Sequence, residues 1–119
     1  AAKKLKNPIE ITPFILTNQP PVLNIWIKTT IKTTQLRAEW RKTHDDDWGD
    51  ATINIKASDL TFMDLSVVND YGMRHGDNSH QFALRLLEGT RIITENSTFI
   101  AGGADTVSLW NKQDGMYYH

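Results

Sequence analysis

The second half of the chain repeats its own strand pattern, and this repeat limits the fold more than any other feature. In both copies a short strand passes through a small turn, "KASD" or "LEGT", into a second strand. Repeats of this length made of short strands are typical of a β-solenoid. A shift of 31 positions places Ile53 on Leu84, Ile55 on Leu86, Phe62 on Ile93, Asp64 on Glu95 and Ser66 on Ser97. The polar loop 69–80 is interpreted as an insertion in the first copy.

Strand signals dominate the rest of the chain as well. The segments "IEITPFIL", "VLNIWIKTTI", "ATINIKA", "LTFMDLSVV", "FALRLLE", "RIITENSTFI" and "TVSLW" are short, rich in β-branched or aromatic residues, and often alternating. In "LTFMDLSV", alternation predicts that Leu60, Phe62, Asp64 and Ser66 share one face. Only "QLRAEW" has helical character. The predicted class is all-β, with a solenoid or a sandwich as the alternatives.

Composition excludes several classes of function. The chain has 119 residues, enough for one domain, and a formal net charge of −1, which gives no basis for binding nucleic acid or an anionic membrane. It has no cysteine and therefore neither disulfides nor thiolate metal sites. No phosphate-binding loop, dinucleotide fingerprint, G-x-S-x-G or H-E-x-x-H motif is present. We therefore expect no cofactor, no nucleic-acid partner and no membrane partner.

Two polar clusters contain residue types that bind metals. "HDDDW" (44–48) lacks the glycine and the distal glutamate of a calcium loop, so a solvated acidic turn before a strand is the preferred interpretation. "RHGDNSH" offers His75, Asp77 and His80, but nothing in the sequence fixes the geometry of this loop. A polar surface loop is preferred here too, and no metal site is predicted.

The stretch "STFIAGGADTVSLW" contains one lone carboxylate, Asp105, directly after the small residues Ala101 to Ala104. Either the backbone turns tightly there, or something approaches the carboxylate closely. Trp110 follows in the same stretch and is the candidate for stacking on a sugar ring. Packing is the preferred role for the other prominent aromatic residues, which are Trp26, Trp40, Trp48, Tyr117 and Tyr118.

From about Asp47 onward, the order of these features resembles the pectin methylesterase (pectinesterase) family of carbohydrate esterases. Three pieces carry the resemblance: "WGDATINIKASDLTFMDLSVVND", "HQFALRLLEGTRIITENSTFI" and "GGADTVSLWNKQDGMYYH". They are similar to the family's "SAT" and "F-x-N-T" strands, its "Q-A-V-A-L-R" and "F-x-N-C-x-F" strands, and its "G-x-Q-D-T-L-Y" motif. Residues 47–119 are thus expected to form pectinesterase-like coils, and residues 1–46 are N-terminal strands that remain unassigned.

The resemblance implies a right-handed parallel β-helix and the hydrolysis of methyl esters of polygalacturonate by paired aspartates. Asp105 takes the position of the general acid and base, and Thr106 matches the following threonine. Ala104 replaces one oxyanion glutamine, and His80 occupies the place of the other. Gln81 is one position late, and a one-residue slip turns a strand side chain to the opposite face. Either His80 donates instead, or a bulge lets Gln81 reach. The small residues before Asp105 are expected to leave room for a sugar ring.

The family's nucleophilic aspartate lies one coil further on, and Asp114 is in the wrong context to replace it. We therefore expect the chain to be an incomplete solenoid that is inactive alone and that self-associates through an open coil end. The resemblance also implies a secreted or periplasmic protein whose partner is pectin or a related acidic polysaccharide, although no signal peptide is recognised in the chain. The alternative is a non-catalytic β-solenoid that binds polysaccharide or has a structural role.

Overall fold

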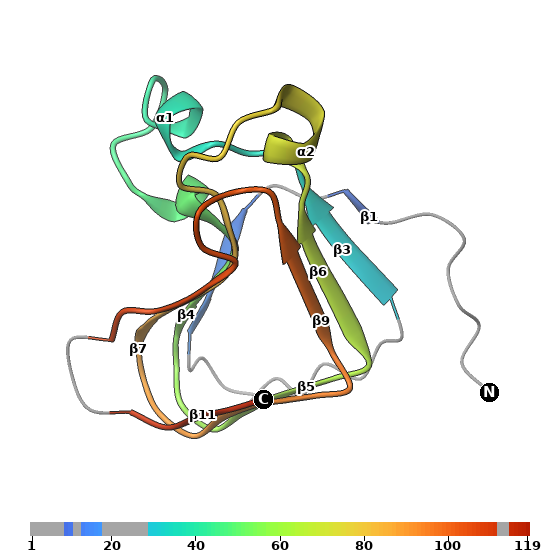
Figure 1. Cartoon of the computed structure of the whole chain (residues 1–119). Coiled ribbons are helices and arrows are strands. Elements are labelled where there is room, and N and C mark those ends of the chain that lie inside the picture. Colours follow the sequence, from blue (N-terminus) through green and yellow to red (C-terminus); the bar gives the residue numbers. More distant parts are fainter. Residues whose placement is uncertain (1–8, 11–12, 18–28, 112–114) are drawn as a thin grey trace.

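The computed structural model describes residues 9–10, 13–17, 29–111 and 115–119, which form three parallel β-sheets with little helix (Figure 1). The predicted all-β class is therefore confirmed. The strands are β1 (Ile9–Glu10), β2 (Phe14–Thr17), β3 (Thr29–Thr33), β4 (Ala51–Lys56), β5 (Leu60–Met63), β6 (Leu65–Asn69), β7 (Phe82–Glu88), β8 (Ile92–Glu95), β9 (Thr98–Ala101), β10 (Val107–Leu109) and β11 (Tyr117–Tyr118). The helices are α1 (Arg37–Trp40), η1 (Trp48–Asp50) and α2 (Tyr71–His75).

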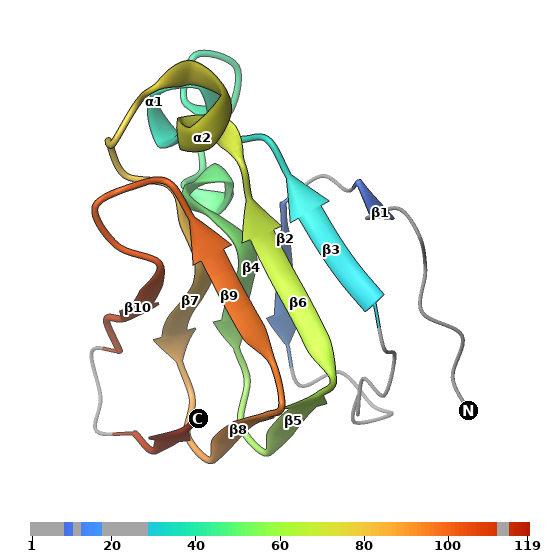
Figure 2. The ribbon, with the colours of Figure 1, turned by 45° about the vertical axis from the view of Figure 1, so that its right-hand side comes forward.

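The strands are arranged as in a parallel β-solenoid, because consecutive strands belong to different sheets and each strand pairs with its counterpart in the next coil. One sheet has the order β1-β3-β6-β9, a second has β10-β7-β4-β2, and a third has β11-β8-β5. We call these sheets A, B and C. The chain passes from B to C to A and then returns to B, so that β3, β6 and β9 lie side by side (Figure 2). Strands β2 and β3, from the segment left unassigned by the sequence, pair with β4 and β6 and so continue the same sheets.

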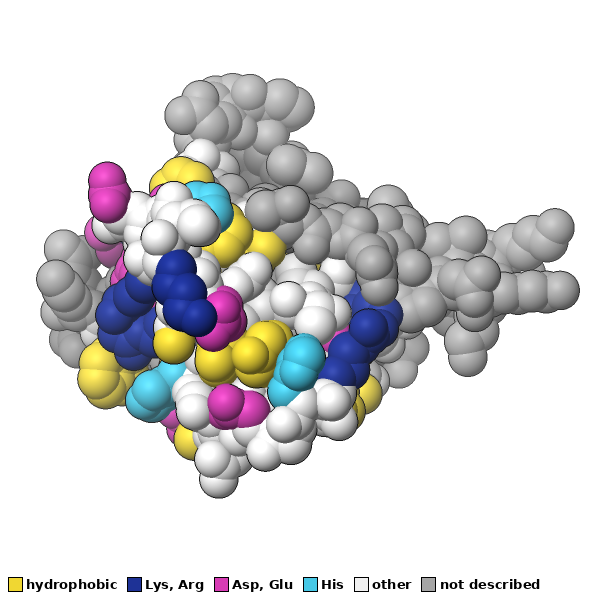
Figure 3. Space-filling model, turned by 90° about the horizontal axis from the view of Figure 1, so that it is seen from above, with side chains coloured by type: hydrophobic (Ala, Val, Ile, Leu, Met, Phe, Trp, Pro, Cys, Tyr) yellow, Lys and Arg dark blue, Asp and Glu magenta, His cyan; other side chains and the backbone are white. Residues whose placement is uncertain are grey.

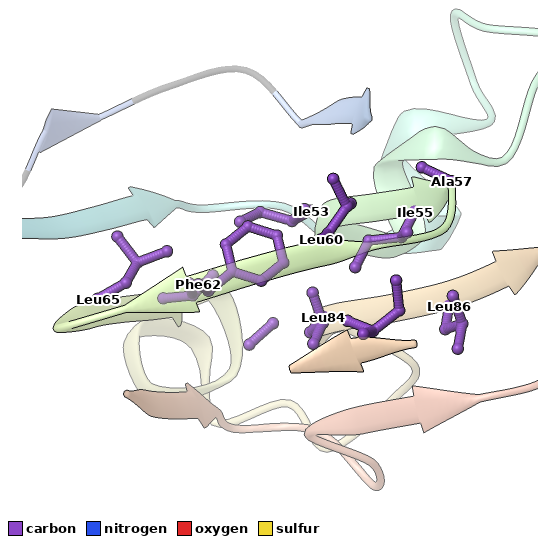
Figure 4. Close-up of a cluster of buried hydrophobic side chains, with 11 residues drawn as sticks. Ile53, Ile55, Ala57, Leu60, Phe62, Leu65, Leu84 and Leu86 are labelled. Atoms are coloured by element: carbon purple, nitrogen blue, oxygen red, sulfur yellow. The ribbon is translucent and has the colours of Figure 1, made fainter. Parts of the chain in front are cut away.

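The core consists of inward-facing side chains that stack on their partners in the next coil. Ile53 of β4 pairs in register with Leu84 of β7, which pairs in turn with Val107 of β10. Ile53 and Leu84 are fully buried, and Figure 4 shows them facing Leu60 and Phe62 of β5 across the interior. Burying an aliphatic side chain of this size stabilises the fold by about 1.5–3 kcal/mol. The stacked rows therefore hold the coils together.

The corners between sheets C and A are single residues in the left-handed conformation. Asp64 has φ 56° and Asn96 has φ 46°, and the amide of Asn96 donates a hydrogen bond to the carboxylate of Asp64. Each corner divides a segment that was predicted as one strand into two strands of different sheets. The predicted face of Leu60, Phe62, Asp64 and Ser66 is wrong beyond Phe62, because the corner resets the alternation and turns Leu65 and Val67 into the core.

The predicted 31-residue shift holds in sheet B but not in sheets C and A. The register slips after Ile55, because Lys56 pairs with Glu88 and leaves Leu87 as an extra residue in the second coil. Phe62 consequently pairs with Thr94 and not with Ile93. By the same slip, Glu95 pairs with Met63 and not with Asp64. Ser66 pairs with Thr98 and not with Ser97.

The three returns from sheet A to sheet B that the structure fully describes lie together at one corner of the coils (Figure 1). They comprise residues 34–50 with α1 and η1, residues 70–81 with α2, and residues 102–106. Helix α1 lies in the "QLRAEW" segment for which helix was predicted, and α2 lies in the predicted polar loop. Within the described residues, no helix is long and apolar enough to cross a membrane. These returns carry most of the polar side chains considered next.

Candidate functional site

A pocket of about 320 Å³ opens on the outer face of sheet B, where the returns from sheet A meet it. Figure 3 views this end of the molecule and shows basic, acidic and histidine side chains around hydrophobic ones. The pocket is lined by side chains from α1, η1, β7, β10 and the adjoining loops, which are Arg37, Asp47, Asp50, His80, Phe82, Arg85, Leu87, Asp105, Ser108 and Trp110.

The floor of the pocket is built around Arg85, which faces outward from β7. Its register partners are Asn54 on β4 and Ser108 on β10. Arg85 Nε donates to Asn54 Oδ1 at 2.9 Å, and Nη1 donates to Asp50 Oδ2 at 2.9 Å and to Asp47 Oδ2 at 3.1 Å. Nη2 donates to the Asp47 carbonyl oxygen at 2.9 Å. The charge of a side chain that is only 7% exposed is thus compensated by two carboxylates, an amide and a carbonyl.

Two carboxyl groups of this network have pKa values displaced in opposite directions. Burial raises the pKa of Asp50 despite the opposing charges of Arg85 and Arg37, and its Oδ1 accepts no hydrogen bond from a described residue. Burial acts in the same direction on Asp47, but the hydrogen bond and charge of Arg85 outweigh it and hold the pKa below the ordinary value. Asp47, whose side chain is 47% exposed, therefore keeps its charge to lower pH than Asp50 does.

The rim of the pocket brings together three residues that the sequence singled out. His80 Nδ1 lies 4.0 Å from Asp105 Oδ2, and both side chains are 56% exposed. Trp110 lies on the same rim and is 85% exposed. An exposed carboxylate, an imidazole and an exposed indole therefore face one pocket. This arrangement suits proton transfer to or from a ligand whose ring stacks on the indole.

Two further candidates from the sequence do not line this pocket. Gln81 is fully buried, and its amide nitrogen donates to the carbonyl oxygens of Asp77 at 2.9 Å and Ser79 at 3.2 Å. Its amide oxygen accepts a hydrogen bond from the Gly72 backbone. Thr106 contributes its carbonyl oxygen to the backbone of β7, where it accepts from Ala83 at 2.9 Å. Of the two oxyanion alternatives, His80 is the residue at the pocket, because Gln81 points to the opposite side of the chain.

The glycines before Asp105 pack against the preceding return and do not hold open a space. A Cβ atom at Gly103 would lie 2.4 Å from Gln81 Cγ and 2.5 Å from the Ser79 carbonyl oxygen. A Cβ atom at Gly102 would lie 2.8 Å from the Met73 backbone nitrogen. The expectation that these residues leave room for a sugar ring is therefore wrong, since the loop 72–81 fills that space. Their absence of side chains allows the close approach that sets the position of Asp105.

The polar clusters considered for metal binding have local roles. His44 stacks on Trp40 with ring centroids 3.7 Å apart, and Asp46 accepts a hydrogen bond from Trp40 Nε1 at 2.7 Å. In the described part of the chain, no three histidine, aspartate or glutamate side chains are grouped as a metal site requires. Among the other aromatic residues, Trp40 is buried, Tyr117 is half-buried, Trp48 and Tyr118 are exposed, and Trp26 lies outside the described residues.

Sequence reasoning missed the charged floor of the pocket. Asp47 was placed in a solvated acidic turn, Asp50 was given no role, and Arg37 lay in the unassigned segment. The 31-residue shift contained a usable signal, because it places Asn54 opposite Arg85 in addition to pairing the core residues. A larger and shallower hollow of about 570 Å³ lies by Thr94, Ser97 and Tyr118, and shares no residue with this pocket.

Comparison with known proteins gives no assignment for this fold or for its pocket. No family model matches the chain, and neither a characterised protein nor a solved structure matches it at a significant level.

Proposed function

We propose that this pocket belongs to a pectinesterase-like carbohydrate esterase that hydrolyses methyl esters of polygalacturonate. The observation that carries the proposal is that Asp105 and His80 lie together at an exposed pocket beside Trp110. Stacking on Trp110 orients a sugar ring, and Asp105 then lies within the same pocket as the ester group. Pectin or a related acidic polysaccharide is the proposed partner, and a role in pectin degradation and cell-wall modification follows from this substrate.

In this proposal Asp105 is the general acid and base. It gives its proton to the methoxy oxygen as methanol leaves, and then takes a proton from the water that hydrolyses the acyl-enzyme. His80 stabilises the oxyanion in place of the glutamine that the family would carry there. Ala104 offers no donor, and loss of one oxyanion donor reduces the rate of a hydrolase by about 10²–10³. The proposed enzyme is therefore slower than one with both donors.

The two carboxylates at the floor of the pocket are both engaged by arginines. Asp50 is buried against two guanidinium groups and is not accessible to an ester carbon. Asp47 is half-exposed and ionised, but its Oδ2 accepts a hydrogen bond from Arg85. The resemblance assigns the attack to a further aspartate beyond the matched motifs. We therefore assign Asp105 the proton transfers and assign the attack to none of the described carboxylates.

The proposed fold is a right-handed parallel β-helix. The order of strands through sheets B, C and A supports a helical path with parallel neighbours. Crossover connections between parallel strands are right-handed in about 98% of cases. A right-handed coil is also what the resemblance to pectinesterases implies.

Methanol release from methyl-esterified pectin tests this function, measured on the protein as its gene encodes it. Asp105→Asn should abolish release, while His80→Gln, which keeps a donor, should retain more activity than His80→Ala. Both side chains are more than half exposed, so thermal unfolding should show a folded protein in each case. Undiminished release by Asp105→Asn would refute the esterase assignment.

A non-catalytic polysaccharide-binding solenoid is the second candidate. It is favoured by the engagement of Asp47 and Asp50 with Arg85, which leaves Asp105 as the freely exposed carboxylate of the pocket. Such a protein would bind methyl-esterified oligogalacturonide through Trp110 and release no methanol. Binding that is lost in Trp110→Ala but unchanged in Asp105→Asn, without methanol release, would identify this second function.

A further inference from the structure

One turn of strands lies at an end of the described solenoid and is paired on its inner side only. β9, β10 and β11 are the last strands of sheets A, B and C, and each pairs with a strand of the preceding coil (Figure 2). We call these three strands the end turn. Within the described residues, no strand pairs with their outer edges. These edges therefore offer a row of unpaired backbone donors and acceptors.

The core rows stop at the end turn with side chains that are only partly covered. One row runs in register through Ile55, Leu86 and Leu109. Ile55 and Leu86 are buried, whereas Leu109 is 48% exposed. Phe99 ends the row of Val67 in the same way and is half-buried. The end turn thus presents the kind of apolar surface on which each inner coil stacks.

Exposed apolar side chains gather at the end turn, and charged residues are absent from its strands. In the described part of the chain, five of the eight exposed large hydrophobic side chains lie between residues 100 and 118, and they are Ile100, Leu109, Trp110, Met116 and Tyr118. The three strands have the sequences TFIA, VSL and YY, with neither a charged residue nor a proline. Edge strands of soluble proteins are usually protected by lysine, proline or a bulge. An edge without such protection is suited to pairing with another strand.

A second copy of this chain fits the end turn better than a single extended peptide does. A peptide would pair with one edge and leave the other two edges exposed. A second end turn offers three edges and the same apolar row ends, and its strands bring no like charge against the first copy. A twofold axis at right angles to the solenoid axis reverses the direction in which the strands circulate. It therefore sets β9 antiparallel to β9 of the copy, and β10 antiparallel to β11 of the copy.

We propose that two copies of the chain associate end to end through their end turns, with a twofold axis that crosses β9. This inference goes beyond the proposed function and does not depend on it. β10 carries Ser108, and Trp110 follows this strand directly, and both residues line the pocket. The edge of the second copy therefore continues the surface of sheet B past the pocket.

Sedimentation velocity tests the association over protein concentrations from about 5 to 500 µM. An end face of one small coil is at the low end of specific interfaces, so half of the chains should be associated at about 10–100 µM. Ile100→Lys should raise this concentration about tenfold or more, because it places like charges on the two facing copies of β9. The matched control is Ile93→Lys, since both isoleucines are 41% exposed but Ile93 lies on β8, outside the end turn. Circular dichroism should show that both variants are folded, because each replaces an exposed side chain.

Thiol cross-linking separates the twofold arrangement from head-to-tail stacking. The chain has no cysteine, so Ile100→Cys supplies a single thiol on β9 of each copy. A short bismaleimide should link this variant into dimers, and should link Ile93→Cys far less. Cross-linking that is no stronger in Ile100→Cys than in Ile93→Cys would overturn the twofold pairing of β9. A monomer at every concentration, equal association of the two lysine variants, or sedimenting species larger than a dimer would also overturn the proposal.

Discussion

Replacement of Arg85 by methionine tests whether the pocket floor is a buried charge network. Arg85→Met keeps an unbranched side chain but removes the donors that Arg85 supplies to Asn54, Asp47 and Asp50. Asp50 would then remain buried, with Oδ1 already lacking a donor and with Arg37 at 3.4 Å as its nearest cation. The variant should therefore be destabilised chiefly by an uncompensated buried carboxylate.

The expected loss is about 3–5 kcal/mol, the usual effect of removing one partner of a buried ion pair. A domain of this kind has about 5–15 kcal/mol of stability in total, so the loss is a large share of it. With a urea dependence of about 2 kcal/mol per molar, the unfolding midpoint should fall by roughly 1.5–2.5 M. Adding Asp50→Asn to Arg85→Met should restore part of this loss, because it removes the stranded charge.

Urea unfolding followed by circular dichroism measures these shifts. The matched control is Arg91→Met, which breaks an arginine–aspartate pair whose two side chains are 57% and 59% exposed. Exposed pairs contribute little, so this midpoint should hardly move. Equal midpoints for Arg85→Met and Arg91→Met would contradict the network described here, as would additive losses in the double variant with Asp50→Asn.

Two further predictions concern the surroundings of the site. Gly103→Ala should destabilise the fold by about 1–3 kcal/mol and reduce any activity of Asp105, because the added methyl group collides with Gln81 and Ser79. The control is Gly76→Ala, in which the added methyl group meets no atom within 4 Å. Its cost is limited to the left-handed backbone at φ 62°, and Asp105 should be unaffected. Comparable loss of Asp105 activity in both variants would refute the packing role of Gly103. The raised pKa of Asp50 means that the folded state holds this proton more tightly than the unfolded chain, so its stabilising contribution is complete below pH 3.8 and is lost as the pH rises through the folded pKa. Asp50→Asn should therefore flatten the fall of stability with pH just above 3.8, and an unchanged pH profile in urea unfolding would show that Asp50 does not titrate there.

The strands and their stacking were largely predictable because they depend on local patterns. Apolar residues at alternate positions mark both strands, as Ile53 and Ile55 in β4 and Leu84 and Leu86 in β7, and the repeat correctly paired Ile53 with Leu84. The corners were not predictable from alternation, because Asp64 and Asn96 occupy a backbone conformation that most residues avoid. The extra residue Leu87 was equally hidden, since one added position leaves no mark in composition.

The site was only partly predictable for a related reason. The sequence singled out Asp105, His80 and Trp110, and the fold brings these three residues to one pocket. Asp50 pairs with both Arg37 and Arg85 through tertiary contacts, and no spacing in the sequence relates α1 to β7. The role of the glycines before Asp105 was misjudged because the loop that fills their space folds back from another coil.

NMR titration with a partially methyl-esterified trigalacturonate tests the location of the ligand site most directly. The indole signal of Trp110 and the amide signals of Ser108, His80 and Arg37 should shift together, since all four residues line the pocket. The indole of Trp48 is an internal control, because it is 40% exposed but does not line the pocket. Shifts confined to Thr94, Ser97 and Tyr118 at the other hollow, or no shifts at all, would contradict the account.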